Sequence, residues 1–361
     1  MKILQVIPYF CFGGAETMCE NLTYALTELG HEVVVVSLIS DRTPIARRME
    51  EAGIRIRYLD KKLGLDLSMF PKLISVMKQE RPDVVHTHLN VIKYAAMAAK
   101  LACGPACVHT VHSVADKEAE GRLQKISNGF YFRHGWSVPI ALSGEIQETI
   151  SDFYRMDKER IPVIRNGVDL SKCMVKEDYS LHAPIRLIHV GRFDVPKNHA
   201  GLLRSFAKLR ETYPDSCLHL LGDGDLRPDM EKLALELGIA DSVQFYGMQA
   251  NVYPHLREAD LFLLPSIYEG NPMSIIEAMG TGLPIAATTV GGIPDMLRNK
   301  ETALLVPCVE EAFCDACRVL LGDENLRHTL GNQARADSVR CSAAFMAQQY
   351  CDVYRKGGIL R

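Results

Sequence analysis

Two glutamates in one short segment are the residues best suited to bind a sugar or a nucleotide. Glu269 and Glu277, with seven residues between them, lie in the segment PSIYEGNPMSIIEAMGTG that begins at Pro265. Carboxylates accept hydrogen bonds from hydroxyl groups, and the free amides at the start of a helix bind phosphate. Pro272 can start such a helix and the later glycines can end it. The alternative is a pair of ordinary surface glutamates.

Two cations form a second candidate site. Arg192 and Lys197 stand five positions apart in the segment GRFDVPKN, which follows an apolar run. Arginine offers a planar fork of donors and lysine a compact point charge, and together they suit a diphosphate. A pair of solvated surface cations would explain the same residues without any ligand.

A glycine pair near the amino terminus is a third and weaker candidate. Gly13 and Gly14 follow the first apolar run and open an expected helix, so the amides there can meet an anion. The pair lacks the G-x-G-x-x-G spacing of a dinucleotide site. A flexible turn between strand and helix explains it equally well.

Apolar runs along the chain are expected to be the strands that position these groups. They are continuous and rich in Val, Ile and Leu, which is typical of parallel strands buried on both faces. Amphipathic segments suited to crossover helices separate them, including 15–29, 202–213, 230–237, 309–321 and 341–354. The pattern predicts an α/β fold of doubly wound parallel sheets. The expected strands are 3–7, 32–37, 84–86, 107–111, 186–190, 217–221, 242–245, 261–265, 284–288 and 303–306.

The alternation of strands and helices starts afresh part-way along the chain. At 361 residues the chain exceeds the usual size of a single core. A further strand-like run at 161–164 leads into a polar stretch that ends at Pro184. We expect domains at 1–175 and 176–340, and a C-terminal helix within 341–361 that packs back on the first domain. Two such domains would face a central cleft, with ligands bound at the strand ends.

Composition and charge exclude several classes of protein. Hydrophobic residues make up 47%, charged residues 24%, and the net charge is -3, so no general attraction to nucleic acid is expected. No stretch reaches the ~18 apolar residues of a membrane span, and the run at 1–8 is too short for a signal peptide. We expect a cytoplasmic protein whose eleven cysteines are free thiols, Cys314 and Cys317 included.

The order of these motifs resembles that of the retaining glycosyltransferases of family four. The resemblance covers nearly the whole second domain and reaches into the first. It implies the GT-B fold, which consists of two Rossmann-like domains with the nucleotide-sugar donor held mainly by the second. Besides the two-glutamate segment, the matching motifs are GR-x4-K from Gly191, LGDG from Leu221, ADLFLLPS from Ala259, GGIPD from Gly291, GGAE from Gly13 and NGVD from Asn166.

The resemblance assigns roles to the candidates of the second domain. Arg192 and Lys197 would bind the donor diphosphate. Glu277 would bind the ribose hydroxyls, and Glu269 would hold the transferred sugar. Amides for the sugar and the phosphate would come from the segment of Gly270, Asn271, Pro272 and Met273.

Three residues of the first domain receive roles in the same way. Gly14, next to Gly13, would approach the phosphate across the cleft. His112, after the expected strand 107–111, would contact the sugar near its reacting carbon. A lone histidine is more often structural, and other histidines near strand ends stay open as alternatives. These are His86, His88 and His109.

The chain departs from the family pattern at three places. Asp295 replaces the usual Glu and keeps its charge. The pair at 301–302 occupies a turn that usually contains Gly, and Asn198 follows the lysine where Gly is frequent. None of these changes removes a proposed catalytic group, so an inactive enzyme is not indicated.

Neither a metal nor another cofactor is expected. Asp223 and Asp225 mimic the metal-binding Asp-x-Asp of the other main glycosyltransferase fold, but a glycine-rich turn after a strand is the better interpretation. Arg192, Lys197 and loop amides can neutralise a leaving diphosphate. The resemblance implies transfer with retention. Because no residue stands out as a covalent nucleophile, we expect front-face attack on an oxocarbenium-like centre, as proposed for similar enzymes, rather than a two-carboxylate double displacement.

The acceptor has no equally clear signature. Similar bacterial enzymes build surface polysaccharides, which implies a donor that is commonly UDP-linked and a saccharide or lipid-linked saccharide acceptor. Basic and aromatic residues at 122–125 and 130–133 could rest on the inner face of the cell membrane, although a plain amphipathic helix explains them too. A nucleotide-sugar epimerase of the same shape and a non-catalytic scaffold subunit remain as alternatives.

Overall fold

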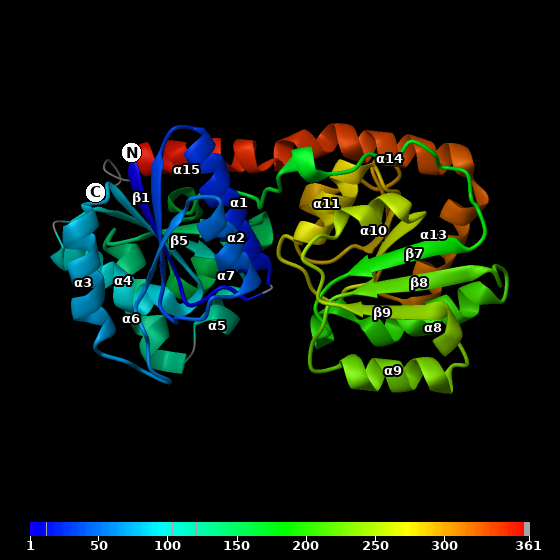
Figure 1. Cartoon of the computed structure of the whole chain (residues 1–361), viewed down its shortest axis with the longest axis horizontal. Coiled ribbons are helices and arrows are strands. Elements are labelled where there is room, and N and C mark those ends of the chain that lie inside the picture. Colours follow the sequence, from blue (N-terminus) through cyan, green and yellow to red (C-terminus); the bar gives the residue numbers. More distant parts are fainter. Residues whose placement is uncertain (12, 103, 120, 357–361) are drawn as a thin grey trace. The chain divides into compact units, whose positions relative to one another are not determined.

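The computed structural model describes residues 1–11, 13–102, 104–119 and 121–356 (Figure 1). The chain divides into two compact units: unit 1 is Met1–Gly167 with the chain from Ala343 onward, and unit 2 is Val168–Ser342. The sequence-based boundary at 175 lies beyond this division. The difference arises because Val168 already pairs within unit 2, where its amide donates to the Cys341 carbonyl at 3.1 Å.

Unit 1 is built on a six-stranded sheet in the order β3-β2-β1-β4-β5-β6. Every pair of neighbours is parallel, for example Leu4 with Val85 between β1 and β4. The order reverses between β1 and β4, which is where open α/β sheets bind ligands. The strands are β1 Lys2–Ile7, β2 Glu32–Ser37, β3 Arg55–Tyr58, β4 Val84–His88, β5 Ala106–Val111 and β6 Val138–Ala141.

Helices cover both faces of this sheet (Figure 1). They are α1 Gly14–Glu28, α2 Pro44–Glu51, α3 Met69–Glu80, α4 Ile92–Leu101, α5 Ala115–Glu118, α6 Gly121–Arg133, α7 Gly144–Tyr154 and α15 Ala343–Lys356, with short 3-10 turns η1 Leu89–Val91 and η2 Lys158–Arg160. The C-terminal helix α15 packs on α1. Buried hydrogen bonds tie it to the sheet, because the Tyr354 hydroxyl meets His86 Nδ1 at 2.7 Å and the Tyr350 hydroxyl meets Thr110 Oγ1 at 2.8 Å.

Unit 2 repeats the same topology, with the order β12-β11-β10-β7-β8-β9 and a reversal between β7 and β10. All its neighbouring strands are parallel. The strands are β7 Ile185–Val190, β8 Ser216–Leu221, β9 Val243–Gly247, β10 Leu261–Leu264, β11 Ile285–Thr288 and β12 Leu304–Val306. The helices are α8 His199–Arg210, α9 Arg227–Glu236, α10 Tyr253–Glu258, α11 Met273–Thr281, α12 Ile293–Met296, α13 Glu310–Gly322 and α14 Glu324–Ser338, with 3-10 turns η3 Leu170–Lys172, η4 Val195–Lys197, η5 Ala240–Ser242 and η6 Val339–Cys341.

The predicted fold class, two doubly wound parallel sheets, is confirmed. The sequence analysis missed two strands that each pair with only one neighbour. In β3 the sequence RIRY alternates charged and apolar residues because an edge strand is only half covered, and β6 is short and contains Pro139. The strand expected at 161–164 was wrong, since Val163 forms only an isolated bridge with Ala141.

Two further findings concern the surface and the thiols. No helix within the described ranges is long and apolar enough to cross a membrane. The described cysteines are free, and Cys314 and Cys317 lie buried on α13 as expected from its helical pattern.

Candidate functional site

The loops after β7 and β10 meet at the point where the order of the second sheet reverses. Lys197 ends the first loop, and its Nζ donates to Glu269 Oε1 in the second at 2.6 Å. Ser266 Oγ donates to the same oxygen at 2.7 Å. A carboxylate that is only 6% exposed needs such partners, because burying an unpaired charge is costly. The structure therefore brings two of the predicted site residues into direct contact.

The contacts of Glu269 leave part of its carboxylate open to a ligand. Both hydrogen bonds reach Oε1, and within the described chain no hydrogen bond or ion pair engages Oε2. An ionised carboxylate can accept about four hydrogen bonds. Glu269 can therefore accept hydrogen bonds from sugar hydroxyls while Lys197 holds its orientation.

Glycines let the loops around this pair approach each other closely. At Gly291, where φ is +55°, a Cβ atom would lie 1.8 Å from the carbonyl oxygen of Glu269. At Gly222, where φ is +133°, a Cβ atom would lie 2.0 Å from the Gly191 carbonyl oxygen. No side chain fits in these gaps. Close packing of the loops thus explains why glycine occurs at Gly291 in the GGIPD motif and at Gly222 in the LGDG motif.

Asn198 shows why one departure from the family pattern is tolerated. It has a φ of +54°, a left-handed conformation that Gly adopts freely and Asn adopts more easily than other residues. Its Oδ1 accepts from the Gly201 amide at 3.2 Å and caps α8, while its Nδ2 donates to the Pro265 carbonyl at 3.0 Å. The side chain therefore links the two loops that carry Lys197 and Glu269.

The segment after Glu269 places the start of α11 beside the ion pair. The helix begins directly after Pro272 and ends at Gly282, which has a φ of +77°, as its sequence predicted. The first amides of a helix have no partner inside it and carry partial positive charge. The loop residues predicted to bind the donor are packed here. Gly270 is partly exposed, and Asn271, Pro272 and Met273 are buried.

Glu277 lies on α11 and has a different environment from Glu269. Burial raises the pKa of its carboxyl to about 7. Across the described residues, no cation forms an ion pair with this carboxylate. A ligand with hydroxyl groups would supply the hydrogen bonds that the protein does not, which fits the predicted role of binding a ribose.

Arg192 differs from Lys197 in its surroundings. It lies two residues after β7 and is exposed, and its side chain makes no described hydrogen bond or ion pair. The predicted convergence of Arg192 and Lys197 on one ligand is therefore not prebuilt, since Lys197 is already bound to Glu269.

The glycine pair of unit 1 adjoins a carboxylate that the sequence analysis did not single out. Gly13 caps α1, which begins at Gly14. A Cβ atom at Gly13 would lie 2.4 Å from Glu16 Oε2, and Cys11 Sγ donates to Glu16 Oε1 at 2.9 Å. A carboxylate suits the positive end of a helix. An acidic residue three positions after the cap was the signal that could have predicted it.

His112 follows β5 and is held at its backbone and its ring. Its amide donates to Glu118 Oε2 at 2.6 Å, and its Nε2 lies 3.2 Å from His88 Nδ1. Burial lowers the pKa of His112 to about 4, although the nearby Glu118 charge acts in the opposite direction. The ring is therefore neutral at physiological pH.

The other three histidines have both ring nitrogens engaged. His86 binds Tyr354 and Thr110, at 2.7 and 2.8 Å. His109 binds Thr87 and Glu118, both at 2.8 Å, and His88 binds Gln5 as well as His112. Of these residues, His112 alone has a ring nitrogen, Nδ1, without a described partner. It is thus the histidine best placed to contact a ligand.

The two aspartates that mimic a metal-binding motif lie in the loop between β8 and α9. Asp223 Oδ2 accepts from Arg227 Nη1 at 3.1 Å, so this carboxylate is already paired. Within the described ranges, no group of three or more His, Cys, Asp or Glu residues is arranged to hold a metal ion.

Comparison with known proteins identifies both halves of the chain. The model of Glycosyltransferase Family 4 matches residues 12–172, and the model of Glycosyl transferases group 1 matches residues 177–337. The chain is a family-four glycosyltransferase of the GT-B fold. The predicted family and the predicted enzyme class are confirmed at this level.

Relatives of this glycosyltransferase include enzymes of surface-glycan synthesis. The lipopolysaccharide core biosynthesis glycosyltransferase LpsE of Rhizobium meliloti is 28% identical, over 95% of this chain and 94% of that protein. The Escherichia coli UDP-Gal:alpha-D-GlcNAc-diphosphoundecaprenol alpha-1,3-galactosyltransferase is 28% identical, over 75% and 74%. The crystal structure of Anabaena HepE in complex with UDP and glucose superposes with a TM-score of 0.85 at 18% identity, over 98% of this chain and 99% of that one. The last similarity concerns the fold.

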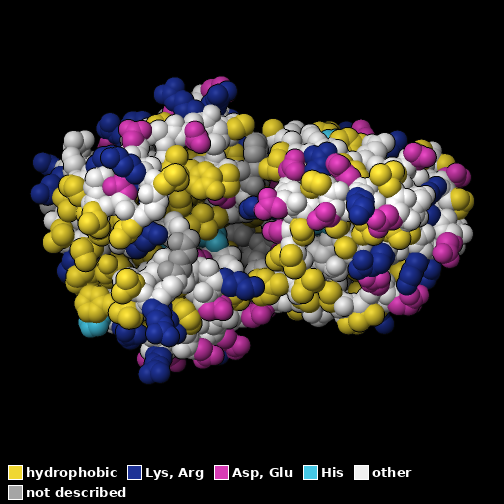
Figure 2. Space-filling view, turned by 90° about the horizontal axis from the view of Figure 1, so that it is seen from below, with side chains coloured by type: hydrophobic (Ala, Val, Ile, Leu, Met, Phe, Trp, Pro, Cys, Tyr) yellow, Lys and Arg dark blue, Asp and Glu magenta, His cyan; other side chains and the backbone are white. Residues whose placement is uncertain are grey.

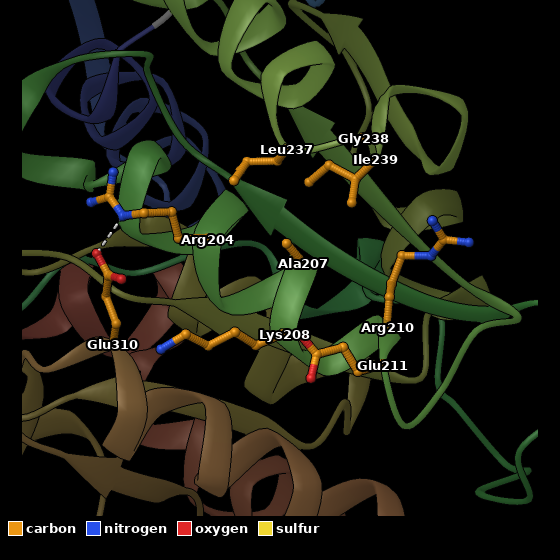
Figure 3. A pocket seen from close by; sticks show the side chains of 9 residues that line it. All are labelled: Arg204, Ala207, Lys208, Arg210, Glu211, Leu237, Gly238, Ile239 and Glu310. Carbon is orange, nitrogen blue, oxygen red and sulfur yellow. Dashed lines mark hydrogen bonds and ion pairs between the residues drawn. The ribbon is translucent and has the colours of Figure 1, made fainter.

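A depression on the surface of this glycosyltransferase's unit 2 differs in character (Figure 3). It is lined by α8 and Glu211, by residues 237–239 and by Glu310, and none of the predicted site residues lines it. Arg204 pairs with Glu310 and Lys208 with Glu311, both at 2.6 Å, and Arg210 donates to the Pro214 carbonyl at 2.9 Å.

Replacement of Glu277 tests its environment through the pH dependence of stability. Folding raises the pKa of this carboxyl, so ionisation of the carboxyl destabilises the folded state. The destabilisation grows as the pH rises from about 4.3, the ordinary pKa of Glu, to about 7, and it reaches its full size above pH 7. Glu277→Gln should therefore raise the unfolding free energy at pH 8 by roughly 1 to 3 kcal/mol, with a clearly smaller gain at pH 5. Denaturant unfolding at both pH values measures this. Glu211→Gln, on an exposed residue, is the control, and an equal effect at both pH values would contradict the assignment.

Proposed function

We propose that this glycosyltransferase moves a sugar from a nucleotide-diphosphate donor to a saccharide or lipid-linked saccharide acceptor, with retention of configuration and without a metal ion. The observation that carries the proposal is the pair of Lys197 and Glu269 beside the amino-terminal end of α11. It combines a cation and helix amides for a diphosphate with a carboxylate for sugar hydroxyls. Few other ligands need both a site for a diphosphate and a carboxylate for hydroxyl groups.

The donor is proposed to lie along the loops of unit 2. The diphosphate would bind Lys197, Arg192 and the amides at the start of α11. The ribose would bind Glu277, whose carboxylate lacks a described ion-pair partner. We favour UDP as the nucleotide because it is the commonest choice in similar enzymes and because HepE, a protein of the same fold, was crystallised with UDP.

The proposed reaction depends on stabilising the leaving group. The bond between the anomeric carbon and the diphosphate oxygen breaks as the acceptor oxygen attacks the same face of the sugar. The acceptor proton leaves with the diphosphate, whose negative charge Lys197 and Arg192 would offset. Glu269 binds Lys197 and Ser266 through Oε1, which suits a carboxylate that orients the sugar rather than one that attacks it. From unit 1, Gly14 and His112 enter this proposal through their match to the family motifs.

The acceptor is proposed to be a saccharide, free or lipid-linked, and the pathway to be surface-polysaccharide synthesis. The names of two relatives support this, one acting on a diphosphoundecaprenol-linked sugar and one in lipopolysaccharide core synthesis. On this view the enzyme would work at the inner face of the cell membrane.

Helix α6 supports a peripheral membrane contact because its first two turns expose apolar side chains and bury polar ones. Leu123 is 85% exposed and Ile126 66% exposed, whereas Gln124 and Asn128 are buried. Water would favour the opposite arrangement. Arg122 and Lys125 are exposed on the same helix, as are Phe130 and Arg133 in its second half. On the face shown in Figure 2, hydrophobic side chains of unit 1 are interspersed with Lys and Arg.

Nucleotide binding tests the donor site. UDP, GDP and ADP would be titrated calorimetrically into the full-length protein with and without EDTA. We expect one nucleotide to bind equally well with the chelator, and Lys197→Ala to weaken it about 10- to 100-fold, as for a lost hydrogen bond to a charged group. Lys208→Ala is the matched control, because this lysine is also in an ion pair on unit 2 but away from the strand ends.

Each other outcome of this titration contradicts a defined part of the proposal. If none of the nucleotides binds, the donor site is wrong and the scaffold alternative gains support. If EDTA abolishes binding, the metal-independent mechanism is wrong. If Lys208→Ala weakens binding as much as Lys197→Ala, the assignment to the loops after β7 and β10 is wrong.

Vesicle sedimentation tests the membrane contact. The protein should sediment with vesicles that contain anionic phosphatidylglycerol, and salt should weaken binding because the basic residues attract the surface. Replacing Leu123 and Ile126 together by Ser should lower the bound fraction several-fold. Leu235→Ser, an exposed leucine of unit 2, serves as control. Unchanged binding of the double variant would contradict the role of α6.

A further inference from the structure

A chain of buried hydrogen bonds in unit 1 leads from helix α1 to His112. It begins at Thr23, whose hydroxyl donates to the Cys19 carbonyl at 2.7 Å. Because that proton is used, the Thr23 oxygen acts as an acceptor toward Gln5, 2.8 Å away. The Gln5 amide nitrogen must therefore face Thr23, which fixes the orientation of the amide group.

The orientation of Gln5 determines the state of His88. Gln5 Oε1 lies 2.9 Å from His88 Nε2 and also accepts from Cys19 Sγ at 3.3 Å. A carbonyl oxygen only accepts, so His88 Nε2 carries a proton. His88 is fully buried, and burial holds the pKa of its ring well below the usual value, so the ring is neutral. Its other nitrogen, Nδ1, therefore has no proton and acts as an acceptor.

The same reasoning passes from His88 to His112. The two rings meet through His88 Nδ1 and His112 Nε2 at 3.2 Å, with ring centroids 5.4 Å apart. Since His88 Nδ1 accepts, His112 Nε2 must donate. In the neutral ring of His112 this leaves Nδ1 without a proton, and Nδ1 is the nitrogen that has no described partner.

We propose that Gln5 and His88 are positioning residues that fix the tautomer of His112, so that His112 offers a hydrogen-bond acceptor to a hydroxyl of the transferred sugar. The link to the sugar rests on the proposed function, whereas the fixed tautomer does not. An acceptor at Nδ1 binds a sugar hydroxyl and disfavours an oxygen of a phosphate, which has no proton to donate. The hydrogen-bonded series of Thr23, Gln5 and His88, which we call the relay, would thus help His112 to distinguish the sugar of the donor from its diphosphate.

The relay also explains the polar side chains inside the first sheet. Gln5, Thr23 and His88 are fully buried, where an unsatisfied polar group would cost about 1 to 3 kcal/mol. Gln5 donates to Thr23 and accepts from His88, and His88 Nδ1 accepts from His112, so each of these polar groups has a partner. Apolar residues at these positions would pack the core equally well but would leave the His112 ring free to exchange its proton between the two nitrogens.

The tautomer can be measured directly in the full-length protein. Histidine labelled with 15N in both ring positions distinguishes a protonated from an unprotonated nitrogen in long-range proton–nitrogen spectra. At pH 7.5 we expect His112 to carry its proton on Nε2 in a single form. A proton on Nδ1, or exchange between the two forms, would overturn the relay even without any variant.

Two buried variants separate the relay from general packing. Gln5→Met keeps the length of the side chain but removes the acceptor for His88 Nε2, so His112 should lose its single tautomer. Cys19→Ala removes a donor to the same Gln5 oxygen but leaves the amide held by Thr23, so the tautomer should stay. If both variants change the His112 spectrum alike, the effect is one of packing and the relay is wrong.

Ligand binding then tests the link to the sugar. In the wild type, UDP-glucose should bind more tightly than UDP. Gln5→Met should lower this gain about tenfold while the affinity for UDP itself stays the same, and Cys19→Ala should change neither. An unchanged gain in Gln5→Met would overturn the role of the tautomer in sugar binding. If none of UDP, GDP and ADP binds the wild type, the proposed function and the sugar partner both fall, while the tautomer result stands by itself.

Discussion

The ion pair between Lys197 and Glu269 is the interaction on which the candidate site depends. It joins the two loops that leave neighbouring strands at the reversal of the second sheet. A largely buried carboxylate is accommodated there because Lys197 and Ser266 both donate hydrogen bonds to it. Asn198 links these two loops directly, and Gly222 and Gly291 let the loops after β8 and β11 pack closely against them. A diphosphate and a sugar would meet a charge arrangement that exists before they bind.

The polar groups around the proposed ligand are set in advance at some cost to stability. Glu277 is partly buried without a described cation, and its raised pKa reflects that environment. His112 is kept neutral by burial and is tied to His88. Polar groups with unused hydrogen-bonding capacity lower the stability of the folded protein slightly, and a bound ligand supplies the hydrogen bonds that they lack.

The sequence predicted the architecture well because buried parallel strands leave a continuous apolar signal. It did not reveal β3, where Arg55 and Arg57 interrupt that signal at an edge of the sheet. The motifs located the loops of the site, yet the contact between Lys197 and Glu269 joins residues far apart in the chain and needs the strand order to be known. Among four histidines near strand ends, the resemblance favoured His112, and the folded protein adds that only this ring has a nitrogen without a described partner. Glu16 escaped notice because its position suggests nothing more than a helix cap.

A double-mutant cycle on Lys197 and Glu269 tests the central claim most directly. Calorimetry would give the affinity for UDP-glucose of the wild type, Lys197→Met, Glu269→Gln and the double variant. If the pair forms the donor site, each single change weakens binding and the double change costs less than the sum, with a coupling on the order of 1 to 3 kcal/mol. Effects that add within about 0.5 kcal/mol would show that the residues act independently. Single variants that bind as the wild type does would show that the donor lies elsewhere.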